Sequence, residues 1–219
     1  MQPYFLPYAG YFRLLARADE FVIFDCVQFP RRGRVHRCEV PGRDGTEWLT
    51  LPLARQARDV RIADLAFGSG ARARFDARLE ALPWIAAARG PSADALRGFL
   101  QAPLEGVVDY LEQGLRLVAG LLGIDCAIRR SSTLGLPAGL RGEDRVLAIA
   151  AALDATHYLN APGGRDLYDR ARFAAAGIAL EFLSPWQGPG MQLLPALLLD
   201  GAAPIASAVR ADGGVPGDP

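Results

Sequence analysis

Residues 156–185, THYLNAPGGRDLYDRARFAAAGIALEFLSP, decide the fold that the sequence predicts. The stretch begins and ends with a short apolar run typical of a strand, and its middle has the apolar spacing of a helix. The residues before it continue this alternation, which favours right-handed crossovers and a parallel sheet. The predicted strands are 124–132, 156–162 and 178–185, and the predicted helices are 143–153 and 165–177. We therefore expect an α/β fold with an open, mainly parallel, Rossmann-like sheet.

The rest of the chain adds a second α/β part and a helical middle. The apolar start of FVIFDCVQF at 21–29 is typical of a strand that is covered on both faces. Two more strands, at 31–40 and 47–53, are joined by the turn PGRDG. The expected parts, within one domain, are 1–70 (α/β), 71–123 (helical), 124–185 (βαβαβ) and 186–219, an irregular tail whose last residues, 211–219, are expected to be disordered.

Composition and charge exclude several classes of protein. The 219 residues are 51% hydrophobic and 22% charged, as in a soluble globular protein. The formal net charge is zero, which argues against a surface devoted to nucleic acid or to an anionic membrane. No apolar run approaches the roughly 20 residues of a membrane span, and we find no secretion signal. Three cysteines without metal-ligand spacing suit a reducing compartment, so we expect a cytoplasmic protein.

All 24 basic residues are arginines, so the chain has no lysine. This excludes a phosphate-loop lysine, a Schiff-base lysine and a Ser-Lys dyad. The signatures GxSxG, HExxH and CxxC do not occur, and we expect no metal site. His36 and His157 have no evident partner, and Cys26 is the one cysteine beside candidate site residues; packing roles stay open for all three.

The turn after the predicted strand at 156–162 is a candidate anion site. Asn160 ends the strand, and Gly163 and Gly164 allow backbone N–H groups to converge where a helix is expected to begin, near Arg165. Arg165 can bind a phosphate or carboxylate through two nitrogens, and open parallel sheets bind ligands at the carboxyl ends of their strands. An ordinary strand-to-helix turn has the same spacing, so both interpretations stay open.

Residues 25–37, DCVQFPRRGRVHR, place an acid, a glutamine and a row of arginines after the most apolar strand. Asp25 and Gln28 are candidate site residues, and the arginines suit a clamp for phosphates or for a polyanionic carrier. The same arginines suit a solvated edge strand that resists aggregation. Ser131 and Ser132, at another predicted strand end, suit either phosphate binding or the capping of a turn.

Residues 1–12, MQPYFLPYAGYF, are unusually aromatic for a chain terminus. The prolines of this segment argue against a regular helix. The segment is either a ligand-binding turn or a hydrophobic plug, and Gln2 and Gly10 have no obvious role in a plug. The tyrosines of the segment are Tyr4, Tyr8 and Tyr11.

Several stretches together resemble the WbqC-like protein family of bacteria. They occur in the family's order over most of residues 2–183. The matching stretches are QPYFLPYAGYF at 2–12, FVIFDCVQFPRRG at 21–33, WLTLPL at 48–53, RSS at 130–132, GEDRVLAIAAALDATHYLNAPGGRDLY at 142–168 and GIALEFL at 177–183. The resemblance implies a role in gene clusters for O-antigen and other surface polysaccharides, or for natural products. It also implies a transferase that acts on an amino sugar.

The resemblance implies a set of site residues and two departures from the family. Cys26 stands where the family leads us to expect a second acidic residue. Only Met1 precedes the QPY motif, where family members have a short apolar strand, so either the start codon is misplaced or that strand is lost. The family positions correspond here to Gln2, Pro3, Pro7, Gly10, Tyr11, Asp25, Gln28, Arg32, Arg37, Ser132, Asn160, Gly163, Gly164 and Tyr168.

The N-terminal part also resembles nucleotidylyltransferase-like enzymes such as pantothenate synthetase in the order of its elements, which is strand, turn, helix and strand. Those enzymes hold ATP phosphates with an HxGH motif, whereas this chain has Tyr8-Ala9-Gly10-Tyr11. Without histidine or lysine the electrostatic stabilisation of adenylyl transfer would be weak. The similarity therefore supports a nucleotidylyltransferase-like fold more than that reaction.

We expect an enzyme that transfers an acyl or aminoacyl group, from an acyl carrier or an aminoacyl donor, to an amine of a small substrate such as a nucleotide sugar. The alternatives are an ATP-using amide ligase or nucleotidylyltransferase, and a non-catalytic module that binds a glycan precursor or carrier. No cofactor is assigned. The expected catalytic residues are Asp25, as base or amine-orienting group, Tyr11 and Gln28. The expected substrate- or phosphate-binding residues are Gln2, Tyr4, Tyr8, Gly10, Arg32, Arg37, Ser132, Asn160, Gly163, Gly164, Arg165 and Tyr168.

Overall fold

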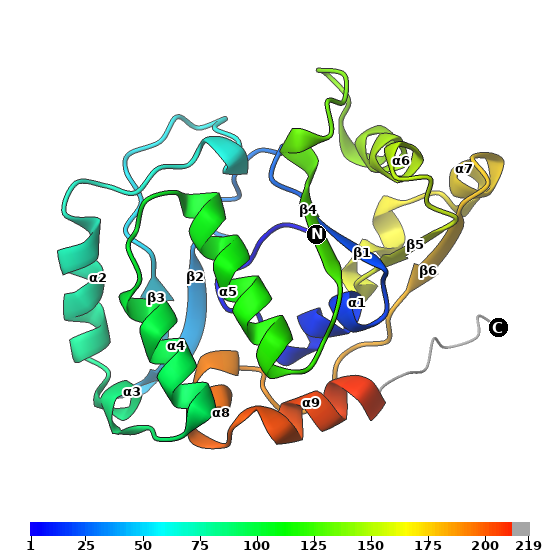
Figure 1. The fold of residues 1–219 in the computed structure, drawn as a ribbon. Coiled ribbons are helices and arrows are strands. Elements are labelled where there is room, and N and C mark those ends of the chain that lie inside the picture. Colours follow the sequence, from blue (N-terminus) through cyan, green and yellow to red (C-terminus); the bar gives the residue numbers. More distant parts are fainter. Residues whose placement is uncertain (212–219) are drawn as a thin grey trace.

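A computed structural model describes residues 1–211, so residues 212–219 of the segment expected to be disordered lie outside the described residues. The described part is a mixed α/β fold (Figure 1). Its strands are β1 (Glu20–Ile23), β2 (Arg37–Gly42), β3 (Gly45–Thr50), β4 (Ala127–Arg130), β5 (His157–Asn160) and β6 (Ala179–Phe182). Its α-helices are α1 (Phe12–Ala16), α2 (Ala71–Glu80), α3 (Pro83–Ala87), α4 (Pro91–Gln101), α5 (Val107–Leu121), α6 (Gly142–Ala152), α7 (Arg170–Ala175), α8 (Leu193–Leu199) and α9 (Ala202–Ala211).

The described strands form three two-stranded sheets rather than the single open sheet that the sequence predicts. β1 pairs with β4 and β5 pairs with β6, both parallel, whereas β2 and β3 form an antiparallel hairpin. Parallel pairing is therefore confirmed for β5 and β6, whereas β4, which was expected in the same sheet, pairs with β1 instead. In Figure 1 the pairs follow one another as β4, β1, β5 and β6, but no backbone ladder joins β1 to β5.

A single residue extends the sheet at the edge of β1 that faces away from β4. The Met1 amino group donates to the Val22 carbonyl (2.9 Å), and the Phe24 N–H donates to the Met1 carbonyl (2.7 Å). These are the two hydrogen bonds of one position in a parallel ladder. One residue does not amount to a strand, so β1 and β5 stay in separate sheets. The same contact places Gln2 beside the carboxyl end of β1.

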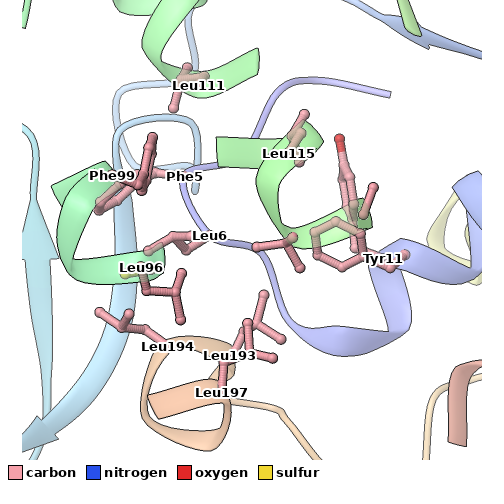
Figure 2. Packing of buried hydrophobic residues seen from close by; sticks show 14 of the residues in the cluster. Phe5, Leu6, Tyr11, Leu96, Phe99, Leu111, Leu115, Leu193, Leu194 and Leu197 are labelled. Carbon is pink, nitrogen blue, oxygen red and sulfur yellow. The ribbon is translucent and has the colours of Figure 1, made fainter. Parts of the chain in front are cut away.

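The predicted helical middle is confirmed as α2 to α5. The apolar stripe of α5 is buried, and the helix ends where the sequence predicts, just before Gly123. The N-terminal segment runs between α4, α5 and α8, with the side chains of Phe5 and Leu6 inserted between those helices (Figure 2). The aromatic N-terminus is therefore part of the hydrophobic core.

The tail that the sequence predicts to be irregular contains α8 and α9. Leu194 and Leu197 are fully buried in the main core, and Ile205 of α9 is buried as well. Pro195 lies in the first turn of α8, where a missing N–H removes no helical hydrogen bond. A seven-residue helix flanked by glycines and prolines is too short to show a periodic pattern, which explains the wrong prediction. Within residues 1–211, no helix has the length and apolarity to cross a membrane.

Candidate functional site

The carboxyl ends of β1 and β4 lie side by side. The two strands are parallel with Ile23 opposite Arg130, so the residues that follow each strand come together at one edge. Asp25 follows β1, and Ser131 and Ser132 follow β4. This edge is the part of the fold where the predicted site residues are most closely connected.

Asp25 is almost fully buried, at 1% exposed, and both of its carboxylate oxygens accept hydrogen bonds. Oδ1 accepts from the Ser131 hydroxyl (2.9 Å) and from the Ser132 N–H (2.9 Å), while Oδ2 accepts from the Ser132 hydroxyl (2.6 Å). Ser131 Oγ also accepts from the N–H groups of Asp25 (3.1 Å) and Cys26 (3.3 Å). The resulting ring of hydrogen bonds holds the ends of β1 and β4 together.

The two serines differ in what they present to solvent. Ser131 is buried at 2% exposed, and its hydroxyl is fully used within the ring. Ser132 is exposed, and its hydroxyl lies between solvent and the buried carboxylate of Asp25. Of the three side chains, Ser132 is thus the one that can touch a ligand, with Asp25 behind it.

Gln28 and Cys26 continue from the end of β1 toward the loop at 54–61. The backbone of Gln28 pairs with that of Arg61, and its exposed side-chain amide donates to the Arg58 carbonyl (2.9 Å). Gln28 therefore holds this loop against the strand end. Cys26 is partly exposed beside Asp25.

Tyr11 is a buried anchor for Gln2. The tyrosine is 1% exposed, and its hydroxyl donates to the Gln2 carbonyl (2.7 Å). Its ring packs against Tyr4 and Phe21, each with ring centroids 5.6 Å apart. Burial, followed by the neighbouring tyrosines, raises the pKa of Tyr11 well above its usual value. The contacts of Tyr11 are thus those of a residue that fixes the main chain of Gln2.

Gly10 allows the N-terminal turn to pack against the segment after β6. A Cβ at Gly10 would lie 2.6 Å from the Trp186 side chain and 2.5 Å from the Tyr8 ring, so only glycine fits. The buried guanidinium of Arg13 donates to the carbonyl (2.6 Å) and hydroxyl (3.2 Å) of Ser184. Arg13 thereby ties the turn to the end of β6. This contact could not be predicted from the sequence, since an arginine in a short helix is usually exposed.

Tyr4 and Tyr8 lie near Arg34, which was not among the predicted site residues. Burial raises the pKa of both tyrosines, and the charge of Arg34 opposes this shift in each. Arg34 also forms an ion pair with Glu39 (2.8 Å) and lies over the ring of Trp48 at 5.3 Å. The spacing of the arginines in the sequence does not indicate that Arg34 lies near Tyr4 and Tyr8.

Arg32 lies on the turn before β2, and Arg37 is the first residue of β2. Arg37 donates to the carbonyls of Gly33 (3.0 Å) and Arg32 (2.6 Å) and lies 4.2 Å from the centre of the Trp48 ring. Arg32 is exposed. Arg37 thus stabilises the turn, a structural role different from the solvated edge strand that the sequence had left open for these arginines.

Asn160 and Gly164 pack together at the carboxyl end of β5. Asn160 is 5% exposed, and its side-chain oxygen accepts from the Ala161 N–H (2.7 Å). A Cβ at Gly164 would lie 2.6 Å from Asn160 Nδ2 and 3.3 Å from the Tyr168 ring. The Gly164 N–H donates to the Ala161 carbonyl (3.0 Å) and is therefore already used. Gly164 is required by this close approach, whereas Gly163 faces open space.

The helix expected to begin near Arg165 begins later. Residues Pro162–Leu167 form a 3₁₀ helix, and α7 starts only at Arg170, where the Asp169 side chain accepts from the Ala171 N–H (2.8 Å). Proline and two glycines favour a tight turn over an α-helix, which explains the difference. The N-terminus of an α-helix is thus not beside the glycines, and the anion-site hypothesis depends on the turn and on exposed Arg165 alone.

Tyr168 belongs to a small aromatic group behind this turn. Its ring meets those of Tyr158 and Phe173 edge to face, each with centroids 5.7 Å apart. Tyr158 is stacked on Phe173 at 5.4 Å, and burial raises its pKa well above the usual value. Tyr168 is only half-buried, so it can both support the turn and meet a ligand.

A family model described as the WbqC-like protein family matches residues 2–189 of the chain. The chain belongs to the WbqC-like protein family. The match includes every predicted site residue and ends before α8, so α8 and α9 lie outside it. The resemblance of the sequence motifs to this family is therefore confirmed.

A curated relative of this WbqC-like chain is an uncharacterized protein of Mycobacterium tuberculosis, Rv1507c. The two are 26% identical over 176 residues, which are 79% of this chain and 75% of the relative. No solved structure matches the chain significantly. The comparisons thus establish the family and leave the activity to be argued from the site.

Proposed function

We propose that the protein transfers an acyl or aminoacyl group to an amine of a small, sugar-like substrate at the carboxyl ends of β1 and β4. The observation that carries this proposal is the pair formed by exposed Ser132 and buried Asp25, whose Oγ and Oδ2 atoms are 2.6 Å apart. A hydroxyl in contact with solvent and backed by a fixed carboxylate is suited to accept and pass on a proton. Asp25 then acts through Ser132 rather than on the substrate directly.

The proposed step is an acyl substitution. The amine nitrogen attacks the acyl carbonyl carbon, a C–N bond forms, and the bond from that carbon to the sulfur or oxygen of the donor breaks. The nitrogen loses one proton, which passes to the Ser132 oxygen as the Ser132 hydroxyl proton moves to Asp25. The Ser132 hydroxyl then gives a proton to the leaving thiolate or alkoxide while Asp25 returns its proton to Ser132, so the products are an amide and the free donor thiol or alcohol.

Other features support the same edge as the place of reaction. Asn160 and the Gly164 turn lie at the equivalent end of β5, and the succession of parallel pairs in Figure 1 supports a Rossmann-like layer, in which ligands bind at this edge. The family resemblance implies the sugar-linked substrate and its nucleotide. Three free cysteines support a cytoplasmic location, where carrier thioesters and nucleotide sugars are available.

The proposal can be tested by metabolite profiling of a strain that lacks the protein. The strain is complemented with the wild-type protein, with Ser132→Ala, or with Ser69→Ala, a matched change of an exposed serine in the loop before α2. We expect an amine-bearing precursor to accumulate in the deletion strain and with Ser132→Ala. It should be consumed with the wild type and with Ser69→Ala.

Two outcomes would contradict the proposal. If the accumulating compound already carries the acyl group, the protein acts at a later step. If Ser132→Ala and Asp25→Asn both restore the product while they remain folded, the pair has no catalytic role, and a non-catalytic binding module becomes the better explanation.

A further inference from the structure

A pocket of about 540 Å³ opens between the first turns of α5 and the carboxyl end of β4. Its volume is within the range of about 300–1,000 Å³ that is typical of small-molecule sites. The pocket does not contain Asp25 or Ser132, but Arg130 on its wall is bonded directly to Ser131. The charged and amide side chains that line it are Glu105, Asp109, Glu112, Gln113, Arg116 and Arg130.

The arginines of this pocket are fixed in place by carboxylates. Arg130 donates to Asp109 Oδ1 (2.7 Å) and to Glu112 Oε2 (2.6 Å). Arg116 donates to Glu112 Oε1 (2.8 Å) and to the Ile128 carbonyl on the outer edge of β4 (2.9 Å). The wall therefore presents preoriented donors and acceptors whose charges are mutually compensated.

Two polar side chains of the pocket have no such partner. Glu105 and Gln113 are exposed, and neither makes a hydrogen bond or an ion pair within residues 1–211. Below them lies the buried ring of Tyr110, which is stacked on Phe99 with centroids 4.5 Å apart. The pocket thus combines free polar groups and a fixed charged wall with an aromatic residue.

This lining selects the chemical class of the ligand. Each hydroxyl of a sugar both donates and accepts, so it needs donors and acceptors side by side, as the arginines, the glutamine and the carboxylates provide. A phosphate would meet three carboxylates and only two arginines, and a hydrocarbon chain would find little apolar surface. A saccharide is the ligand that matches these groups.

We infer that this pocket binds the saccharide part of the substrate, beside the Ser132–Asp25 pair. The path from the pocket to the pair is short in the chain, because Arg130 lies in the pocket and Ser132 follows two residues later. A sugar in the pocket would lie against Arg130, two residues before Ser132. The identity of the reacting amine rests on the proposed function, whereas saccharide binding does not.

Saccharide binding can be measured on the whole protein by calorimetry and by amide chemical shifts. The probes are D-glucosamine, N-acetyl-D-glucosamine and inorganic phosphate. We expect both sugars to bind with millimolar affinity and to shift the amide signals of Gly106 and Gln113, and phosphate to do neither. Gln113→Ala and Glu105→Ala should each weaken sugar binding about tenfold, the effect of one lost hydrogen bond.

Two further variants test whether the sugars bind in this pocket and not elsewhere on the protein. Gln113→Trp, on the exposed rim, should fill the pocket and abolish binding without loss of the folded state. Glu80→Ala removes an exposed glutamate at the end of α2 and should leave binding unchanged. The inference is overturned if neither sugar binds, if phosphate shifts the same amides, or if only glucosamine binds, because the pocket would then be an ammonium site.

The test separates this inference from the proposed function. If sugars bind as expected and no acyl transfer is found, the proposed reaction is wrong and the saccharide pocket stands. If acyl transfer occurs and Gln113→Trp leaves the KM for the amine substrate unchanged, the reaction stands and the pocket assignment is wrong.

Discussion

Asp25→Ala should destabilise the protein by about 4 kcal/mol. The carboxylate accepts from the Ser131 hydroxyl, the Ser132 N–H and the Ser132 hydroxyl. Exposed Ser132 can return its hydroxyl to water, whereas the Ser131 hydroxyl and the Ser132 N–H would lose their partner at the strand ends. Each unsatisfied group costs about 2 kcal/mol, which gives the total.

Two milder variants separate the contributions of the Asp25 charge and of the Ser132 hydroxyl to this loss of stability. Asp25→Asn keeps an oxygen for Ser131 and for the Ser132 N–H but loses the negative charge, so we expect a loss of about 1–2 kcal/mol. Ser132→Ala removes one exposed hydroxyl and keeps its N–H bond, so the loss should be at most about 1 kcal/mol. If the pair transfers a proton, both variants should nevertheless lose most of their activity.

Urea unfolding followed by circular dichroism measures these differences, provided that the m-values agree among the variants. Asp59→Ala, a change of an exposed aspartate without a partner among the described residues, is the control and should stay within about 0.5 kcal/mol of the wild type. A cost below about 1 kcal/mol for Asp25→Ala would show that the carboxylate does not hold the two strand ends together. An equal cost for Ser132→Ala and Asp25→Ala would show that the buried groups contribute no more than the exposed hydroxyl.

Three other substitutions test contacts outside this ring. Gly164→Ala should cost about 1–3 kcal/mol in thermal unfolding, because its Cβ would lie 2.6 Å from an amide nitrogen, whereas Gly163→Ala should cost far less. Burial, and then a neighbouring arginine, lowers the pKa of His36 below 6.5. As the pH falls below about 6.5, His36 takes up a proton more readily in the unfolded chain than in the folded protein, which favours unfolding. The urea midpoint of the wild type should therefore fall between pH 7 and pH 5, and the midpoint of His36→Phe should fall less over the same range. Arg13→Lys should lower the free energy of unfolding, measured in urea, by about 2 kcal/mol, because one ammonium group does not reproduce the two contacts to Ser184.

The parts of the fold that the sequence predicted correctly are those whose signal is local. The stripe of α5 repeats over 15 residues, so its period is unambiguous. The β2–β3 hairpin follows from the turn residues at 41–45, and the parallel β5–β6 pair follows from the alternation of strand and helix at 156–185. In each of these cases neighbouring residues determine the structure.

The parts that could not be predicted depend on contacts between distant residues. Asp25 and Ser131 are 106 positions apart, so nothing in either stretch shows that the Ser131 hydroxyl donates a hydrogen bond to the Asp25 carboxylate. Arg13 and Ser184 are 171 positions apart, and a buried arginine looks like an exposed one in the sequence. The neighbours of β1, which are β4 on one edge and Met1 on the other, also depend on tertiary structure, since the pattern predicts strands but not the neighbours of each strand.

The N-terminal aromatic segment need not be either a plug or a ligand-binding turn, since it has features of both. Phe5 and Leu6 fill the space between α4, α5 and α8 (Figure 2). Leu6 adopts φ 45°, a left-handed conformation that costs a leucine about 1–2 kcal/mol, and core packing alone does not require it. The main chain bends at Leu6, and the carbonyl of Gln2, four residues earlier, is held by Tyr11 while Met1 pairs with β1. The burial of Phe5 and Leu6 thus stabilises the strained conformation of Leu6 and anchors the segment whose first two residues lie at the sheet edge, which is what a rigid ligand-binding edge requires.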